Sequence, residues 1–374
     1  MFLRIRLGWK SSEVYKGACS LVSIIMKRVS ILIPTIDSGG AEKQAVLLAV
    51  QLSKHTTVNL IVLYGNHSEY ELNVKMLTES DVIVHKLSGN IFSKICTINT
   101  ILKNTKTEVL LNYLTLPNVL GSIIGRTQGI KVYNGIRSSR LPRAKMLAER
   151  IVHNRFATGT IFNCYSGLTY FQSKGFNAEK NIVIPNCFNN IAPAMNREDR
   201  ALKRIITVGR FDSSKDYETL ISSISMLKRD DFMLCIVGYG VLEDQIRSWV
   251  KQYGIEDKTE IHIKPNNVAE LERGADIYLS SSVFEGTSNS IMEALNWSLP
   301  VVATDVGDND HLIINGENGF LHSVGDAKGL SSSVSRLLDS IELRNQMGVK
   351  GNQLLQQDYS MGTFEQRYIR LIEE

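Results

Sequence analysis

The sequence is dominated by short, continuous apolar runs, rich in β-branched residues, that recur at intervals long enough to hold a helix. Runs such as VSILIP do not alternate with polar residues, which is typical of strands buried on both faces of a parallel sheet. A first series comprises residues 29–34, 58–64, 81–87, 108–114, 130–136, 158–164 and 181–186. A second series comprises residues 204–210, 232–240, 260–264, 275–280, 299–305 and 318–323. We therefore expect two doubly wound α/β units in tandem.

A stretch of weak periodicity separates the two series. Residues 187–202, CFNNIAPAMNREDRAL, contain turn-forming asparagines and a proline, so we interpret them as the linker. The boundary predicts a first unit at residues 26–190 and a second unit at residues 191–358. Residues 359–374 include FEQRYIRLIEE, in which apolar residues recur at helical spacing. This pattern predicts an amphipathic helix at the end of the chain.

Residues 1–25 are interpreted as an N-terminal extension, because MKRVSILIPT from Met26 is how many α/β proteins begin. Their apolar run is short and lacks a clear cleavage site, which does not favour a signal peptide. No apolar run reaches the roughly 18 residues of a membrane-spanning helix. The five cysteines are scattered without a C-x-x-C pair, which indicates reduced thiols in a cytoplasmic protein.

The composition is that of a globular protein. Apolar residues make up 43% of the chain and charged residues 21%, which excludes a disordered or fibrous protein. The formal net charge is +4. A mildly basic balance suits an anionic ligand or an acidic membrane surface, without selecting either.

Two loops at the expected carboxyl ends of strands carry residues that suit a phosphate group, and ligands of open parallel sheets bind at such ends. Gly39 and Gly40 would let backbone N–H groups approach an anion at a helix start, although an ordinary tight turn is the alternative. Arg210 and Lys215, in VGRFDSSKDYETLI, could clamp a diphosphate. Their alternative is a pair of solvated surface charges.

A third loop, SSVFEGTSNSIMEAL at residues 281–295, places Glu285 and Glu293 around a Gly/Ser/Thr/Asn-rich turn. Carboxylates accept hydrogen bonds from sugar and ribose hydroxyls, so acids beside a phosphate-binding helix start suit a nucleotide sugar. Ser290 and Glu293 also have the spacing of a capping box, in which Glu293 would cap its own helix. Such a cap would not explain Glu285 or Gly286.

Together these motifs resemble those of the family 4 retaining glycosyltransferases, which have the GT-B fold. Glu285, seven intervening residues and Glu293 match the family's E-x7-E signature. VGRFDSSKDYETLI is similar to its VGR…K…LI segment, GGAEKQ to its GGAE, and LPVVATDVG and INGENGFL to its closing elements. The motifs occur in the family's order over nearly all of residues 26–374. The resemblance implies two Rossmann-like domains facing across a cleft, with the C-terminal helix packing back on the first.

The resemblance also implies roles for individual residues. Arg210 and Lys215 would hold the donor diphosphate and stabilise charge on the leaving group, with Glu285 as the third catalytic residue. Glu285 would contact the donor sugar, and Glu293 would accept bonds from the ribose hydroxyls. The further donor-binding residues implied are Gly39, Gly40, Gly238, Gly286, Thr287, Ser288 and Asn289.

The activity implied is that of a retaining, metal-independent hexosyl- or N-acetylhexosaminyltransferase without a cofactor. Its co-substrate would be a nucleotide-diphospho sugar, which we expect to be UDP-linked. Its acceptor would be a saccharide on a polyprenyl diphosphate, in the assembly of a surface polysaccharide such as lipopolysaccharide, O-antigen or capsule. Alternatives are a soluble acceptor, a UDP-sugar epimerase and a non-catalytic nucleotide-sugar-binding protein. A nicotinamide oxidoreductase is disfavoured because GYGVLE lacks the full G-x-G-x-x-G. No nucleic-acid partner is expected.

The acceptor side departs from the family pattern. Many relatives have a histidine in the stretch that corresponds to residues 112–122, and this chain has none there. Asn112 is a candidate substitute, and Arg137, in GIRSS, would touch the acceptor or its phosphate. Residues 137–156 are strongly basic and could form an amphipathic helix on an anionic bilayer, with a solvated helix face as the alternative. We therefore expect a cytoplasmic protein that can bind peripherally to the inner face of the cytoplasmic membrane.

Two sequence features bear on metal binding. DND, at residues 308–310, matches the metal-binding D-x-D of the other main glycosyltransferase fold. It lies late in the chain after a buried strand, so we interpret it as a loop. The seven histidines show no ligand spacing, and no metal site is predicted.

Overall fold

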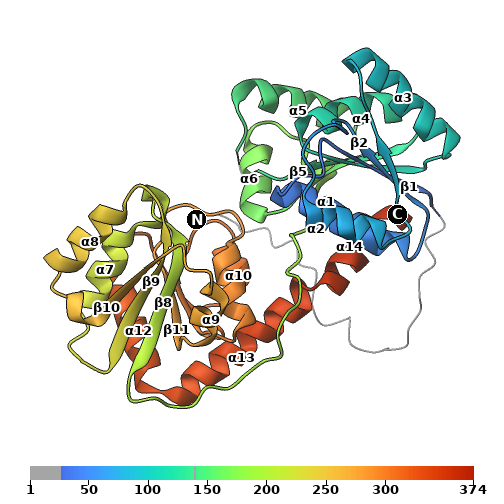
Figure 1. Cartoon of the computed structure of the whole chain (residues 1–374). Helices are drawn as coiled ribbons and strands as arrows, with labels where there is room; N and C mark the ends of the chain where they lie inside the picture. The colour runs from blue at the N-terminus through green and yellow to red at the C-terminus, as the bar shows by residue number, and fades with distance from the viewer. Residues whose placement is uncertain (1–26, 139) are drawn as a thin grey trace.

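The computed structural model describes residues 27–138 and 140–374, which form two α/β units (Figure 1). The N-terminal extension predicted at residues 1–25 lies outside the described residues. Every strand pairing described is parallel, and each apolar run identified in the sequence contains one strand. The prediction of two doubly wound parallel sheets is therefore confirmed.

The first unit contains a seven-stranded sheet in the order β3-β2-β1-β4-β5-β6-β7. Its strands are β1 (Val29–Ile33), β2 (Val58–Val62), β3 (Ile83–Lys86), β4 (Val109–Tyr113), β5 (Lys131–Ile136), β6 (Gly159–Phe162) and β7 (Asn181–Val183). Its helices are α1 (Gly40–Ser53), α2 (Glu71–Thr78), α3 (Ile91–Asn104), α4 (Thr115–Thr127), α5 (Arg143–Arg155), α6 (Tyr165–Ser173) and the short η1 (Ala178–Lys180). Every residue of β1, β2 and β4 is buried, because helices cover both faces of the sheet.

The second unit contains a six-stranded sheet in the order β10-β9-β8-β11-β12-β13. Its strands are β8 (Lys203–Arg210), β9 (Phe232–Tyr239), β10 (Thr259–Ile263), β11 (Ile277–Ser280), β12 (Val301–Thr304) and β13 (Gly319–His322). Its helices are α7 (Tyr217–Ser225), α8 (Glu243–Gln252), α9 (Val268–Arg273), α10 (Asn289–Asn296), α11 (Asn309–Leu312), α12 (Ala327–Asp339) and α13 (Ile341–Asp358), with the short η2 (Ser213–Lys215) and η3 (Glu256–Lys258). Helices α7, α8 and α12 pack on one face and α9 and α10 on the other, while α13 contributes Met347 to the core on the first face and Leu355 to the core on the second.

The chain passes between the units twice. The described residues 184–202 run from β7 to β8 without a regular helix or strand, apart from a bridge between Phe188 and Ser360. At the other end, α13 is followed by α14 (Met361–Glu373), and Figure 1 shows these two helices in red leading from the second unit to the first. Phe364, Tyr368, Leu371 and Ile372 of α14 are buried in the core of the first unit.

The end of α14 is fixed to the first unit by lysine side chains. Lys27 Nζ donates to the carbonyl oxygens of Ile372 and Glu373 at 2.6 and 2.8 Å, and Lys131 Nζ donates to that of Glu374 at 2.7 Å. Cations at these carbonyls satisfy groups that a helix end leaves without partners. The last helix of the chain is therefore a structural part of the first unit.

The carboxyl ends of strands from both sheets meet where the units touch. The loop after β6 contacts the loops after β11 and β12, since Thr287 Oγ1 donates to the carbonyl of Asn163 at 3.3 Å. The backbone N–H of Tyr165 donates to the Asp308 carboxylate at 2.8 Å. In a parallel sheet these loops form one edge, which is where ligands bind.

Candidate active site

The central feature of the site is an ion pair between Lys215 and Glu285. Lys215 Nζ lies 2.5 Å from Glu285 Oε1, and Ser282 Oγ donates to the same oxygen at 2.8 Å. The two side chains are only 17% and 13% exposed. A cation and a carboxylate held this closely in a shielded place offset each other's charge. The structure therefore brings together two of the three residues predicted to be catalytic.

Local hydrogen bonds fix the loop that presents Lys215. Asp216 has a left-handed conformation, with φ of 44°, and its carboxylate caps α7 by accepting from the Thr219 N–H at 3.3 Å. Aspartate is among the few residues that adopt this conformation readily. Ser281 Oγ donates to the carbonyl oxygens of Lys215 and Asp216 at 2.8 and 2.7 Å. The loop after β8 is thereby joined to the loop after β11.

Gly238 of β9 lies where the backbones of β8 and β9 approach each other closely. A Cβ atom at Gly238 would lie 1.8 Å from the carbonyl oxygen of Gly209, so a side chain there would push the ends of β8 and β9 apart. Lys215 in turn crosses Gly209, where a Cβ atom would lie 3.2 Å from Lys215 Cε. Gly238 therefore keeps β8 and β9 close together, and Gly209 leaves room for the Lys215 side chain.

Arg210 lies at the end of β8 with an exposed side chain. Its guanidinium is 3.5 Å from the Asp212 carboxylate, and the side chain is 74% exposed. An exposed ion pair contributes little, so the guanidinium is available to an anionic ligand. The structure places Arg210 one residue beyond Gly209, but its head is not part of the Lys215–Glu285 pair.

Helix α10 does not begin where the predicted capping box of Ser290 and Glu293 requires, which would be with Ser290 as the N-cap residue. Helix α10 starts at Asn289, with Ser288 as the N-cap residue. Ser290 is therefore already inside the helix, and the interpretation of Glu293 as the partner in a Ser290 capping box is wrong. Glu293 lies on the second turn of α10, and burial raises the pKa of its carboxyl. Its side chain remains available for another role.

A second buried acid stands beside Glu293, and the sequence had not singled it out. Glu272 of α9 is 2% exposed, and its Oε1 has no hydrogen-bond partner among the described residues. Burial and then the charge of Glu293 raise the pKa of Glu272 to about 8. Glu272 is therefore mostly protonated at neutral pH. No motif could have revealed it, because a glutamate in ELERG is typical of an exposed helix.

The loop at residues 284–289, called the donor loop after its predicted role, is joined to the first unit through Asp308. The Asp308 carboxylate accepts from the N–H groups of Tyr165 and Ser166, each at 2.8 Å, and from Thr287 Oγ1 at 3.1 Å. The ring of Tyr165 stacks on that of His311, with centroids 3.8 Å apart. The predicted loop at residues 308–310 is corrected in part, since Asn309 begins α11.

Gly39 and Gly40 lie at the start of α1, as the loop pattern predicts. Gly39 is the N-cap residue with φ of −60°, and Gly40 is the first helical residue. The carboxylate of Glu42 folds back against Gly39, where an added Cβ atom would lie 2.3 Å from Glu42 Oε2. The glycine makes room for this acid, and the approach of the two glycines to a donor stays a prediction.

The two candidates for acceptor binding have different surroundings. Asn112 is buried in the domain core, where its Nδ2 donates to Asn134 Oδ1 at 2.9 Å, so its position gives no support to the acceptor role. Arg137 lies with its guanidinium 4.5 Å from the centroid of the Tyr113 ring, and it donates to Tyr368 Oη at 2.7 Å. A buried Arg137 Nε has no partner among the described residues. Arg137 therefore links the end of β4 to α14, and its contact with an acceptor stays a prediction.

The described residues include one group with the composition of a metal site. Donor atoms of Cys235, Glu260 and His262 lie within 4.8 Å of one another on β9 and β10. The prediction that no histidine has a ligand pattern missed this group, because it forms between neighbouring strands. Cys235 pairs with Ile206, four residues before Arg210 at the end of β8. The group is thus separate from the edge that carries Lys215.

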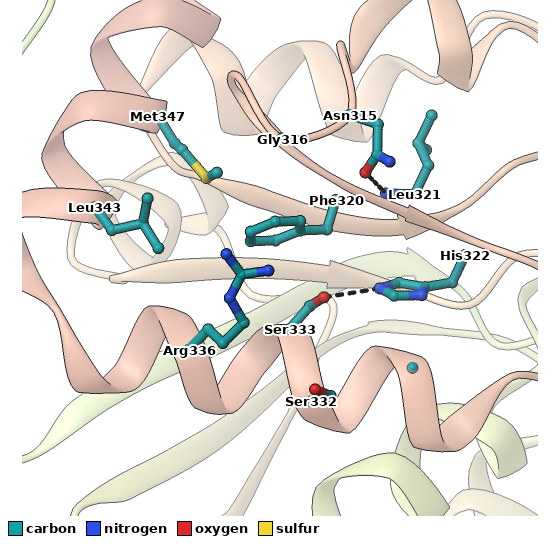
Figure 2. Close-up of a pocket in the computed structure, with 11 residues that line it drawn as sticks. Asn315, Gly316, Phe320, Leu321, His322, Ser332, Ser333, Arg336, Leu343 and Met347 are labelled. Carbon is teal, nitrogen blue, oxygen red and sulfur yellow. Dashed lines mark hydrogen bonds between the residues drawn. The ribbon is translucent and has the colours of Figure 1, made fainter.

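A cavity of about 500 Å³ lies on the outer side of the edge strand β13, between α12 and α13. Figure 2 shows Arg336 reaching over the ring of Phe320, 4.7 Å from its centroid, and the bond from His322 to Ser333 at 2.8 Å. None of the predicted site residues lines this cavity. It is distinct from the edge where the two units meet.

The chain is similar to known transferases. A family model described as glycosyl transferases group 1 matches residues 191–354. Two relatives come from Campylobacter jejuni. The first, named as a GalNAc-alpha-(1->4)-GalNAc-alpha-(1->3)-diNAcBac-PP-undecaprenol alpha-1,4-N-acetyl-D-galactosaminyltransferase, is 22% identical and covers 93% of this chain and 99% of its own. The second is named as an N-acetylgalactosamine-N,N'-diacetylbacillosaminyl-diphospho-undecaprenol 4-alpha-N-acetylgalactosaminyltransferase. It is 26% identical, and the match covers 85% of this chain and 92% of the relative.

A solved structure supports the fold. The Anabaena protein HepE in complex with UDP superposes with a TM-score of 0.74, at 16% identity, over 92% of this chain and 99% of its own. The match spans both units, so the arrangement of two facing sheets is the GT-B fold. The resemblance inferred from the ordered motifs is confirmed. The second unit of the chain matches the group 1 glycosyl transferases over residues 191–354, and the chain is a glycosyltransferase.

Proposed function

We propose that this protein transfers a sugar, with retention of anomeric configuration, from a UDP-linked donor to a saccharide carried on a polyprenyl diphosphate. The observation that carries the proposal is the shielded Lys215–Glu285 pair, 2.5 Å apart, at the carboxyl edge of the second sheet. The names of the two Campylobacter relatives specify undecaprenol-linked acceptors, and the HepE structure was solved with UDP. These support the two substrate classes.

The donor diphosphate is the leaving group, so the main task of the protein is to orient and neutralise it. As the bond between the anomeric carbon and the diphosphate breaks, negative charge grows on the phosphate oxygens. Lys215 and Arg210 would face that charge, and Lys215 would exchange part of its bond with Glu285 for the phosphate. Glu285, once released, is placed to accept from the hydroxyls of the sugar.

The nucleotide would lie along the start of α10. Backbone N–H groups at a helix start favour an anion, and Ser288 and Asn289 stand there. Glu293, one turn further on, would accept from the ribose hydroxyls. Gly286 and Thr287 belong to the loop before this helix. Gly238 has no side chain, so the nucleotide could approach the backbone at the end of β9. Gly39 and Gly40 would reach the donor from the first unit.

The proposal includes metal independence. The charge of the diphosphate would be met by Lys215, Arg210 and the start of α10, so the residues present can supply the stabilisation that a divalent cation gives elsewhere. Transfer should therefore persist at full rate in a strong chelator. Loss of activity in chelator that is restored by magnesium would overturn this part of the proposal.

The acceptor side would face the membrane through α5. Ala144, Leu147 and Ile151 are exposed on this helix, whereas Glu149 is buried and accepts two bonds from Asn118. The helix therefore shows its apolar stripe, with basic neighbours, to the surroundings and keeps its acid inside. This arrangement suits the surface of an anionic bilayer. None of the helices in the described part of the chain is long and apolar enough to cross a membrane.

The test is a transfer assay with radiolabelled UDP-sugars and membrane extract. Label that moves into the lipid fraction supports the proposal. Label in a water-soluble product would replace the lipid acceptor by a soluble one. Conversion of the donor sugar without an acceptor would indicate an epimerase, and tight donor binding without turnover would indicate a binding protein.

A further inference from the structure

A single buried carboxylate joins the two units at the donor loop. Asp308 is 1% exposed and stands between β12 and α11 in the second unit. Its Oδ2 accepts from the Tyr165 N–H and its Oδ1 from the Ser166 N–H, each at 2.8 Å. Both donors belong to the first unit. A buried carboxylate needs such partners, because an unpaired charge away from water is costly.

The Asp308 carboxylate also caps helix α6 of the first unit. The first N–H groups of a helix have no partner within the helix, and α6 begins at Tyr165. Its N-cap residue, Cys164, makes no side-chain capping bond. A capping residue is usually supplied by the same chain segment, and here it comes from the opposite unit. The negative charge also matches the positive end of the α6 dipole.

The same residue holds the donor loop. Its backbone N–H donates to the carbonyl of Gly286 at 3.1 Å, and its Oδ2 accepts from Thr287 Oγ1 at 3.1 Å. Gly307, with φ of 61°, lets the loop after β12 pass so close that a Cβ atom there would lie 2.5 Å from the Glu285 carbonyl oxygen. Asp308 therefore touches both residues that directly follow Glu285.

Two ring contacts surround this junction. Tyr165 stacks on His311, and the Arg140 guanidinium lies 5.0 Å from the centroid of the Phe284 ring. Each contact joins one residue of the first unit to one of the second. The hydrogen bonds of Asp308 thus lie between two aromatic contacts. Together these contacts fix the orientation of the two units more firmly than isolated surface ion pairs would.

We infer that Asp308 is a positioning residue for sugar transfer: it fixes the donor loop and the start of α6 to each other, and so sets the domain orientation in which Glu285 faces the acceptor side. The inference rests on the proposed function for its catalytic consequence. It predicts that removing the carboxylate changes turnover more than donor binding, because Lys215, Glu285 and Glu293 are left in place.

The test compares Asp308→Asn with Asp310→Asn in the full chain. Asparagine keeps the size of the side chain but turns an N–H₂ group toward one of the two helix donors. Asp310 is the matched control, since it stands two residues on, is exposed, and lies 3.9 Å from His311. Three quantities are measured: hydrogen exchange of the amides of Tyr165 and Ser166, the Kd for UDP, and kcat with a labelled UDP-sugar.

For Asp308→Asn we expect exchange at Tyr165 and Ser166 to rise at least tenfold, kcat to fall at least tenfold, and the Kd for UDP to stay within about threefold of wild type. Asp310→Asn should match wild type in all three. Unchanged exchange in Asp308→Asn would overturn the junction. Faster exchange with full kcat would overturn the positioning role.

Thr287→Val provides a second variant in case Asp308→Asn does not fold. It removes the hydroxyl that bonds Asp308 and keeps the carboxylate, so kcat should fall while the Kd for UDP stays within about threefold of wild type and exchange at Tyr165 and Ser166 stays at the wild-type rate. A wild-type kcat in this variant would contradict the link to the donor loop. Absence of transfer by the wild-type protein with every UDP-sugar would refute the proposed function, and the exchange data would still decide whether the junction exists.

Discussion

At the scale of the residue, the site depends on charges that are held in place before any ligand arrives. Lys215 and Glu285 form a pair that water reaches poorly, and Ser282 supports the shared oxygen. Separating Lys215 from Glu285 costs less free energy when a diphosphate replaces the carboxylate as the partner of the lysine than when water does. The buried Glu272 and the half-buried Glu293 add a second, pH-sensitive pair of acids.

The first prediction concerns Lys215. Lys215→Ala should lower kcat/KM by about 10²- to 10³-fold, or about 3–4 kcal/mol of transition-state stabilisation, on the scale of losing one aligned donor. Steady-state kinetics with a UDP-sugar measure it. Lys228→Ala, at an exposed position of the same unit, is the control and should leave the rate unchanged. Full activity of Lys215→Ala would show that the diphosphate is held elsewhere.

The second prediction concerns Glu272, whose pKa is raised to about 8 by burial and by Glu293. Because the folded protein holds this proton more tightly than the unfolded chain, its contribution to stability is present at low pH and is lost as the pH rises through about 8. Glu272→Gln should therefore gain about 2–3 kcal/mol, roughly 4–10 °C in Tm, relative to wild type between pH 6 and pH 9.

Thermal unfolding at the two pH values measures this gain. Glu270→Gln, on the same helix at an exposed position, is the control and should follow the wild-type pH dependence. An identical pH dependence in Glu272→Gln and wild type would mean that Glu272 is ionised in the folded protein at neutral pH.

At the scale of the element, the strands and the start of α1 could be predicted from the sequence, whereas the start of α10 could not. A strand buried on both faces must be apolar throughout, so strands such as β1 and β2 each left a continuous run. Ser288 and Ser290 are equally good caps by composition, and the choice between them depends on how α10 packs after β11. The role of Asp308 could not be predicted for another reason. Its hydrogen bonds to Tyr165 and Ser166 join residues that are 143 and 142 positions apart in the sequence.

The C-terminal helix supplies the third prediction. Phe364 of α14 is buried in the first core and meets the ring of Tyr368 edge-on, 5.0 Å between centroids. Phe364→Ala should destabilise the protein by about 3–5 kcal/mol, the cost of a cavity left by a large core side chain. Urea unfolding measures the loss, with Glu373→Ala at the exposed end of the helix as the control. A change below about 0.5 kcal/mol, the range of ordinary surface substitutions, would mean that α14 docks only loosely.

At the scale of the whole molecule, the two sheets meet by the edges at which their strands end. The loop after β6 and the loops after β11 and β12 touch there, so a ligand held by one unit is presented to the other. The same arrangement leaves α5 exposed on the first unit. Under the proposed function, the donor and the lipid-linked acceptor would be bound by different units and brought together by the orientation of those units.

The fourth prediction is that the protein binds anionic vesicles through α5. The double variant Arg143→Ser/Lys145→Ser removes two cations beside the exposed apolar stripe, which should weaken binding about 30-fold at about 1 kcal/mol for each charge. Vesicle sedimentation measures it, at equal protein and lipid concentrations. Lys228→Ser/Lys251→Ser, two exposed positions on the second unit, is the matched control. Equal losses in the two double variants would indicate a non-specific effect of charge.

The central claim is that Lys215, Arg210 and the start of α10 hold a nucleotide diphosphate while Glu293 reads its ribose. A crystal structure of the UDP complex tests this most directly. We predict phosphate oxygens within about 3 Å of Lys215 Nζ and of the Arg210 guanidinium, with the ribose hydroxyls bonded to Glu293. UDP bound with its diphosphate away from Lys215 and Arg210, or with its ribose away from Glu293, would contradict the account.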